Sequence, residues 1–508
     1  MSESIFINLF LIFINKVTEI LKESRIYSML KSFGAWIFED IKKSKFVKLI
    51  WKDEKASFYI KYSIFLQYVQ VKLNKFSEMC REKYKKNKSL FESSVIFLVL
   101  NEISKNIVFA LGIIFCIQMI IPEHLWHNTY NIIFIFLVLL LYLIKVTVDI
   151  RFNINVHKLD LSILAFMAAV ILGVFNSKFS IDSVRYLCFY ASILIFGVVL
   201  VNSIRNKYAF MKFVRCIVIM SFLMCVYGIC QMIIGIPVDP LLIDLNMGQL
   251  LSRVYSTLGN PNIYAGVLVL VVPFCILMFL ESSSIRERFF VAITVFLLVY
   301  NIALTYSRAA YVSVIVAIFT FLILKNVRLV PLVLILLILV IPLIPSDVIT
   351  RLLTLGKDTS STYRFGIWQT SIKMIKDNWF LGIGINMDNY KLIFTRYSVL
   401  TAPAHSHMFF LQIWLELGIF GIVTMFWIII RFLKWALKVL FLETDKKMSN
   451  IIIANVSSLM GVILFGFSEN IGFSLRILYM FWTVVILLVI SLNISGKQYK
   501  KIDMEIVE

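Results

Sequence analysis

Long apolar runs, separated by short polar segments, fill the chain from about residue 105 to residue 493. A helix needs about 20 apolar residues to cross a bilayer, and runs close to that length recur throughout this region. Their number and spacing predict an all-α fold, a polytopic transmembrane helical bundle of about 12 spans. The predicted spans are residues 105–121, 129–145, 159–176, 185–204, 214–235, 264–281, 289–306, 309–325, 329–345, 407–430, 450–468 and 474–493.

The polar segments between the spans alternate in charge. Basic residues follow the second, fourth, sixth, eighth and tenth spans, as in the group Arg205, Lys207, Lys212 and Arg215. The short loops on the other side carry almost no Lys or Arg. Because positively charged loops stay in the cytoplasm, this pattern predicts a multi-pass membrane protein with both termini cytoplasmic. The bias toward Lys, Ile, Phe and Asn indicates an AT-rich genome, which favours the bacterial cytoplasmic (inner) membrane.

Three regions follow from the same pattern. Residues 1–97 hold no run long enough to span, and their many Lys residues alternate with aromatic and aliphatic ones. This predicts a basic amphipathic region in the cytosol or on the membrane surface, or alternatively a cytosolic extension that binds a partner protein. Residues 98–493 form the predicted transmembrane domain, with a large external loop at 345–406, and residues 494–508 a cytosolic tail.

Composition narrows the class of protein. The chain is 60% hydrophobic and only 16% charged, which excludes an ordinary soluble domain. The net charge of +20 is explained by the cytoplasmic loops, so we expect no nucleic acid partner. The seven cysteines lie mostly in apolar runs without a Cys-x-x-Cys pair, which indicates core residues rather than disulfides or metal ligands.

Three arginines are predicted at the outer face from distant parts of the chain: Arg253, Arg308 and Arg364. Arg308 stands at the end of a span, where a cation is costly unless it pairs or reaches water. No Asp or Glu lies near it in sequence. Since guanidinium groups bind phosphate through two parallel hydrogen bonds, the three indicate a site for a doubly charged anion. The alternative is three separate arginines, each reaching water or a distant acid.

Two histidines stand at the start of the tenth predicted span: His405 lies just before it and His407 is its first residue. His407 is a candidate general base because an imidazole with an ordinary pKa near 6.5 accepts a proton at neutral pH. Interfacial packing is the alternative role. The pairs His405-x-His407 and His124-x-x-His127 lack a carboxylate or Cys partner set, so we predict no metal site.

Four segments in this order resemble the O-antigen ligase and O-antigen polymerase superfamily. They are GNPNIYAG, TYSRAA, YRFGIWQTSIKMIKDNWFLGIGINMDNY and HMFFLQIWLELGIFG. The resemblance runs from about residue 182 to residue 492 and is strongest over 250–425. It implies a polytopic glycosyltransferase that takes a glycan from an undecaprenyl-pyrophosphate-type carrier and joins it to an acceptor hydroxyl, with inversion and with no cofactor or metal.

The resemblance also implies roles for single residues. Arg253, Arg308 and Arg364 fall on the phosphate-contacting arginines of the family, and His407 falls on its proposed catalytic histidine.

Glu416 matches an acidic position in the tenth span, where a buried hydrogen bond between helices is the alternative role. Met408 departs from the usual polar residue after the histidine, and His405 leaves the register of the base open. In the external loop, Trp368 and Trp379 would offer flat surfaces to sugar rings or to the lipid.

The expected partners are the membrane, the lipid-linked glycan donor, a glycan or lipid acceptor, and polysaccharide-assembly proteins that bind residues 1–97. A ligase and a polymerase share this machinery and differ only in the acceptor. A solute or anion transporter is an alternative, although it should show broken helices and charges at mid-membrane depth, often in repeated halves. A scaffold for polysaccharide export is a further alternative, which depends on residues 1–97 alone.

Overall fold

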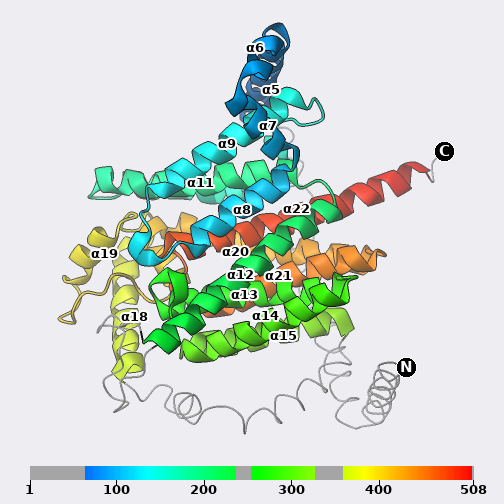
Figure 1. Ribbon diagram of the computed structural model, residues 1–508. Helices are drawn as coiled ribbons and strands as arrows, with labels where there is room; N and C mark the ends of the chain where they lie inside the picture. The colour runs from blue at the N-terminus through cyan, green and yellow to red at the C-terminus, as the bar shows by residue number, and fades with distance from the viewer. Residues whose placement is uncertain (1–62, 236–252, 327–358, 506–508) are drawn as a thin grey trace, which may run out of the picture. The chain divides into compact units, whose positions relative to one another are not determined.

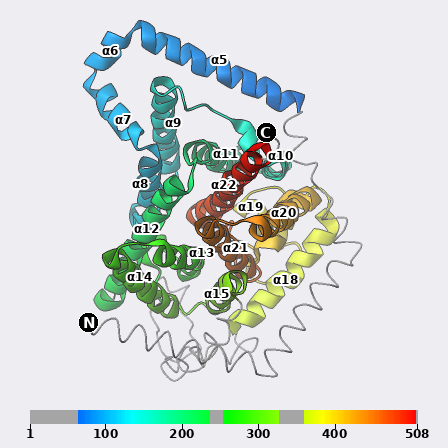
Figure 2. The ribbon, with the colours of Figure 1, turned by 90° about the vertical axis from the view of Figure 1, so that its right-hand side faces the viewer.

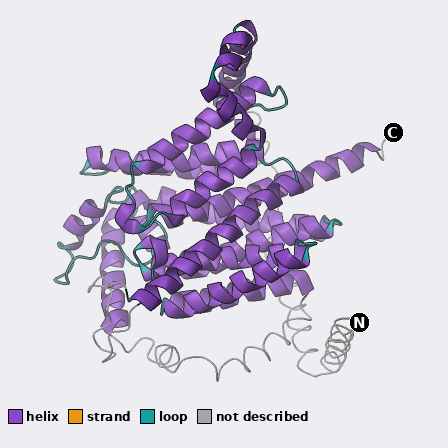
Figure 3. Ribbon diagram, in the orientation of Figure 1, coloured by secondary structure: helices purple, strands orange, loops and turns teal. Residues whose placement is uncertain are grey.

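The computed structural model describes residues 63–235, 253–326 and 359–505. In these residues all regular structure is helical and no strand is present, which confirms the predicted all-α class (Figure 3). Most of the N-terminal region, the predicted span 329–345 and the first part of the external loop lie outside the described residues. The predicted boundary at residue 97 falls inside a helix, α7.

The helices follow one another along the chain with short connections. They are α5 (Ile64–Lys86), α6 (Lys88–Ser93), α7 (Val95–Lys105), α8 (Ile107–Ile120), η1 (Glu123–Leu125), α9 (Tyr130–Val148), η2 (Val156–Lys158), α10 (Leu161–Phe175), α11 (Ser180–Ser203), α12 (Lys207–Ile234), η5 (Ser256–Leu258), α13 (Pro261–Glu281), α14 (Ile285–Leu304), α15 (Arg308–Asn326), α18 (Thr359–Asn378), α19 (Met387–Phe394), α20 (Phe409–Leu442), α21 (Lys446–Gly466) and α22 (Leu475–Glu505).

Nine of the described helices are long and apolar enough to cross a membrane, which confirms a multi-pass membrane protein. A tenth span exists only if α7 and α8 count as one, and these two helices meet at an angle of 96° around Asn106. The span predicted at 105–121 corresponds to α8, which has only 14 residues and counts as a span only together with α7. The span predicted at 159–176 is a helix of only 15 residues, α10.

The centre of the bundle is formed by α13, α21 and α22. In these three helices 78–89% of the apolar segment is buried, against 28% in α14 and α15. Apolar residues surround the central helices on every side, as a helix enclosed by other helices requires. Figure 2 shows α13, α21 and α22 surrounded by the other helices of the bundle.

The two ends of the bundle differ. At one end, basic residues of the predicted cytoplasmic loops pair with acids, as in Arg431–Asp160, Lys207–Asp445 and Arg215–Glu287. The other end carries the loops after α8, α10, α12, α14 and α21 together with α18 and α19, and we call it the loop-rich end. There α18 runs across the ends of the other helices rather than alongside them (Figure 1).

A broken helix attaches the segment that contains α18 and α19 to this end. Within α20, Gly418 has φ 63° and ψ −158°, so the helical hydrogen bonds are interrupted there. The freed carbonyl oxygens of Leu415 and Glu416 accept from the backbone N–H groups of Ile383 and Gly384 at 2.6 and 3.1 Å. In return, the N–H of Ile419 donates to the Phe380 carbonyl at 3.1 Å. The loop after α18 thus pairs with α20 as one strand pairs with another.

We expect Gly418→Ala to unfold the protein at a markedly lower temperature. A side chain there would need a backbone conformation that is essentially restricted to glycine, and its Cβ would meet the Phe380 carbonyl. Strain and clash together should cost about 3 kcal/mol or more. Thermal unfolding in detergent measures the loss.

Gly235→Ala is the matched control. Gly235 also has a positive φ, 72°, but nothing lies within 4 Å of an added Cβ. This variant should lose only about 1–2 kcal/mol. Equal losses in the two variants would mean that the pairing with the Phe380 segment does not stabilise the fold.

Candidate active site

Arg364 projects from α18 to the loop that joins α21 to α22. Its terminal nitrogens donate to the Ser468 carbonyl at 2.7 Å and to the Glu469 carboxylate at 2.6 Å. Only 22% of the Arg364 side chain and 10% of the Glu469 side chain are exposed. The sequence pattern does not indicate this acid, because 105 residues separate it from Arg364 along the chain.

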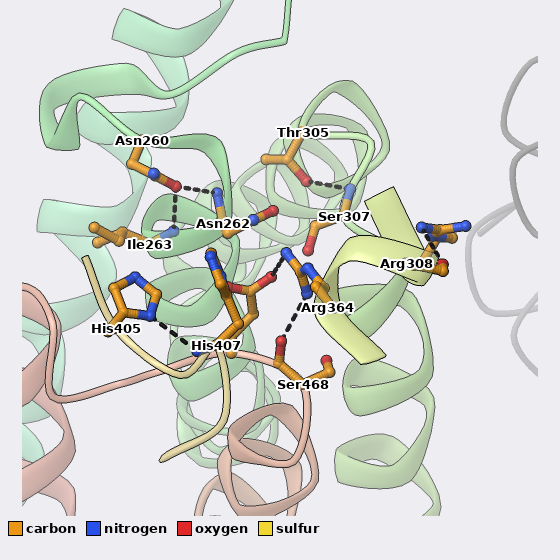
Figure 4. A network of polar contacts seen from close by, with 12 residues as sticks. Asn260, Asn262, Ile263, Thr305, Ser307, Arg308, Arg364, His405, His407 and Ser468 are labelled. Atoms are coloured by element: carbon orange, nitrogen blue, oxygen red, sulfur yellow. Dashed lines mark hydrogen bonds and ion pairs between the residues drawn. The ribbon is translucent and has the colours of Figure 1, made fainter. Parts of the chain in front are cut away.

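Two imidazole rings meet just before α20. The ring centroids of His405 and His407 are 4.3 Å apart, and the backbone N–H of His407 donates to Nδ1 of His405 at 3.1 Å (Figure 4). Nδ1 of His405 is thus an acceptor, which leaves its proton on Nε2. Nδ1 of His407 is buried and has no hydrogen-bond partner within the described part of the chain. His407 therefore keeps an unused ring nitrogen.

Both histidines are neutral at pH 7. Burial lowers the pKa of His407 to about 4, assisted by the Arg364 cation and opposed by the Glu469 carboxylate. Burial also holds the pKa of His405 well below its ordinary value, with contributions from His407 and Arg364. A neutral imidazole is the form that can accept a proton. The expectation that His407 opens the tenth span is wrong, because Met408 is the N-cap and α20 begins at Phe409.

Gln412 ties the histidine segment to α20. Its Oε1 accepts from the Ser406 N–H at 2.8 Å, and its Nε2 donates to Oε1 of Glu416 at 2.8 Å. The observed hydrogen bond of Glu416 therefore runs within its own helix rather than between helices. Because Gln412 is only 4% exposed, it fixes the position of both its partners. Only the spacing of four residues between Gln412 and Glu416 indicates this role in the sequence.

A cavity of about 140 Å³ lies beside these residues. It is lined by His405, Gln412 and Glu416 on one side and by Tyr186 and Tyr190 of α11 on another. Such a volume is about ten times what one water molecule requires. The polar lining gives this space both hydrogen-bond donors and acceptors.

The other two predicted arginines have partners of their own. Arg253 is buried, and it donates to the Thr305 carbonyl and to Oδ1 of Asn262, each at 2.8 Å. It connects the start of α13 to the turn before α15. Arg308 begins α15 and donates to the hydroxyl of Ser361 on α18 at 3.2 Å. Figure 4 shows Arg308 apart from Arg364 and the histidines, so the three guanidinium groups do not meet at one point.

Backbone strain is concentrated around this site. Among the described residues other than glycine, three have a positive φ: Ser256 at 50°, Tyr306 at 50° and His407 at 53°. Each lies one to three residues from Arg253, Arg308 or His405 in sequence. Such conformations cost about 1–3 kcal/mol each and are typical of functional segments that the rest of the fold holds in place.

The two tryptophans of the predicted external loop differ in exposure. Trp379 is 52% exposed and lies next to Phe380, which is 50% exposed and contacts Phe420 of α20. This places Trp379 beside an apolar surface. Trp368 is half-buried on α18, and its indole N–H has no partner in the described residues. Trp368 is thus the better placed of the two to donate a hydrogen bond to a ligand.

Comparison with known protein families gives a match for one part of the chain. A family model described as O-antigen ligase matches residues 293–426. This match confirms the resemblance for residues 293–426, which we call the O-antigen ligase region. Comparison with curated proteins and with solved structures gives no significant match.

The O-antigen ligase region contains most of the candidate site. Arg308, Arg364, His405, His407 and Glu416 lie inside it. The two parts of the site that lie outside are the Arg253 segment, before the region, and the Glu469 loop, after it. The family match supports a membrane glycosyltransferase of the O-antigen ligase or polymerase type.

We expect the Arg364–Glu469 pair to contribute measurably to folding. Hydrogen bonds to charged groups in such a largely buried position are worth about 1.5–3 kcal/mol. In a double-mutant cycle of Arg364→Ala and Glu469→Gln, the double variant should lose less stability than the sum of the single variants. Thermal unfolding of the four proteins in detergent gives the coupling.

The pair Arg185–Asp182 is the matched control, because its 4.0 Å contact is exposed on both sides. Its cycle should show coupling within error of zero. If the Arg364–Glu469 cycle were equally additive, this ion pair would have no part in holding α18 against the loop.

Proposed function

We propose that the chain moves a glycan from an undecaprenyl-pyrophosphate-type carrier to an acceptor hydroxyl on the outer face of the bacterial cytoplasmic membrane. In this proposal the loop-rich end faces outward and both chain termini lie in the cytoplasm. The activity class comes from the O-antigen ligase region. The observation that carries the mechanism is the buried ring nitrogen of His407, which is unused and stands beside the Arg364 cation.

The reaction exchanges one bond for another at the anomeric carbon. The acceptor oxygen forms a bond to this carbon, and the bond from the carbon to the pyrophosphate oxygen breaks. His407 takes the proton of the acceptor hydroxyl, and the pyrophosphate leaves with the electron pair. Because the attack comes from the face opposite the leaving group, the configuration inverts.

Arg364 supports the departing pyrophosphate. Two contacts account for part of its five N–H donors, and the remaining ones are available to phosphate oxygens. Fixed donors of this kind stabilise charge that develops in the transition state. Arg253 and Arg308 are proposed to contact phosphate as well, from the start of α13 and from α15.

Binding of the donor also activates the base. The Arg364 cation is one reason for the low pKa of His407 in the free protein. A pyrophosphate on Arg364 brings negative charge next to the imidazole and raises its pKa toward the ordinary value near 6.5. His407 thus becomes a stronger base once the donor is present, which favours transfer over reaction of the acceptor alone.

His405 serves as a positioning residue in this mechanism. Its Nδ1 accepts the backbone N–H of His407, so this nitrogen is not available to the acceptor while the segment keeps its form. Gln412 and Glu416 hold the other side of the segment. The acceptor is either a second lipid-linked glycan or a different molecule, and both fit this mechanism.

The transporter alternative is less well supported. A transporter uses the free carbonyls of a broken helix to bind its ion. The break in α20 lies near the loop-rich end, and its carbonyls at Leu415 and Glu416 are occupied by the loop after α18.

We expect transfer to depend on His407 far more than on His405. His407→Ala should bind the lipid-linked donor but lose roughly 10²–10⁴-fold in transfer, the usual contribution of a general base. His405→Ala should lose less, since it only positions its neighbour. The measurement is glycan transfer in membranes supplied with purified donor, at matched protein levels and with a chelator present.

Two outcomes would contradict this assignment. If His405→Ala were inactive and His407→Ala active, the base would be the other histidine. If both variants kept full activity, no histidine would act as a base.

We expect different pH profiles for the free and donor-bound protein. The profile of kcat/KM for the donor reports the free protein, in which His407 has a pKa of about 4. Its protonation then abolishes the base only as the pH falls towards 4, so kcat/KM should stay flat through pH 6.5. The profile of kcat reports the complex and should fall at a higher pH. A kcat/KM that already halves near pH 6.5 would contradict the buried, neutral base.

A further inference from the structure

A second and larger cavity opens at the loop-rich end. Its volume is about 880 Å³, and we call it the acidic groove because the carboxylates of Glu123, Asp182 and Asp388 lie along it. Its walls come from the loop between α8 and α9, from the start of α11 and from the start of α19. The volume is within the usual range for a site that holds a ligand of several rings.

One buried group in the groove lacks a partner. Asn386 is only 2% exposed, and its Oδ1 accepts the Asp388 N–H at 2.7 Å, which fixes the orientation of the amide. Its Nδ2 therefore stands as a donor, and it has no hydrogen-bond partner in the described residues. A buried donor left unpaired costs about 1–3 kcal/mol. Such a cost is expected where a ligand supplies the missing acceptor.

The charges in the groove limit what this ligand is. Glu123 pairs with Arg476, and Asp182 lies 4.0 Å from Arg185, so these acids are partly neutralised. Asp388 is exposed and pairs with no described cation. Phosphate or uronate groups would meet like charge here, which disfavours them. Hydroxyl groups can pair with both the acceptors and the donor of the groove, because they donate to carboxylates and accept from Nδ2 of Asn386.

The groove leads to the candidate active site. The groove and the smaller cavity beside His405 and Glu416 share four lining residues: Asn128, Tyr186, Phe189 and Met387. A chain of sugar rings in the groove can therefore extend its last hydroxyl past Tyr186 towards the histidines. The rings of Tyr186 and Phe189 offer the apolar faces on which sugar rings pack.

We propose that the acidic groove binds the acceptor, as a hydroxyl-rich glycan without acidic groups, and that Asn386 selects it through the Nδ2 donor. The role of this glycan as the acceptor rests on the proposed transfer reaction. The binding of a glycan in the groove does not depend on that reaction. It assigns the donor and the acceptor to different walls of the site, with Arg364 on the donor side and α11 and α19 on the acceptor side.

The test compares Asn386→Asp with the wild type in lipid nanodiscs. Aspartate keeps the oxygen that caps α19, replaces the Nδ2 donor with a second oxygen, and adds a negative charge, which the control variant adds as well. Asn206→Asp is the matched control, because Asn206 caps α12 through the same kind of bond, to the Ala209 N–H at 2.8 Å, at the other end of the bundle. Two ligands are used as probes. One is undecaprenyl pyrophosphate, and the other is the neutral glycan fraction prepared from the envelope of cells that make this protein.

In Asn386→Asp we expect glycan binding to weaken roughly three- to tenfold, as the loss of one hydrogen bond predicts, while undecaprenyl pyrophosphate binds as before. The KM for the acceptor should rise by the same factor. Asn206→Asp should match the wild type in every measurement. Binding of a neutral glycan should not change between low and high sodium chloride, because salt screens only charged contacts.

Each contrary result has a separate meaning. Unchanged glycan binding in Asn386→Asp, or weaker binding of undecaprenyl pyrophosphate, would overturn the groove as the acceptor site. Strong salt dependence would overturn its neutral chemistry. If glycan binding depended on Asn386 but the wild type transferred nothing, the groove would stand and the proposed transferase would fall.

Discussion

The pairing between broken α20 and the loop after α18 is the constraint on which the loop-rich end depends. A membrane helix normally satisfies its own backbone, and breaking one exposes carbonyls that water does not reach. Here Gly418 makes the break possible, and the N–H groups of Ile383 and Gly384 fill the vacant positions. The break and the loop are therefore stable only together. Since Glu416 lies in the paired turn, one of the candidate site residues is positioned directly by this exchange.

The same exchange determines where α18 lies, and thereby where Arg364 lies. From α18, Arg364 reaches Glu469 in the loop between two of the most buried helices, α21 and α22. The ion pair thus attaches α18 to the buried centre of the bundle. The histidine segment lies between these two attachments, which explains how His407 can keep a strained backbone with φ 53°.

Sequence patterns predicted what depends on local chain properties. Span positions follow from the length of apolar runs, so most of the helices appeared near their predicted places, and the four resemblance segments gather at one end. Contacts between distant segments were not predictable. Nothing in the sequence near Arg364 indicates Glu469, and nothing near His407 indicates that burial would lower its pKa. Arg308 shows both cases. Its position at a helix end was predicted, whereas its separation from Arg364 was not (Figure 4).

Unsatisfied polar groups connect the fold to the chemistry. In apolar surroundings a donor or acceptor without a partner destabilises the protein, so folding alone disfavours it. His407, Asn386 and Trp368 each keep one such nitrogen at the loop-rich end. These three groups stand on the histidine segment, on the start of α19 and on α18, the elements that the broken helix and the Arg364–Glu469 pair hold in place. The stability supplied by those two attachments is what permits the three groups to remain unpaired until substrates arrive.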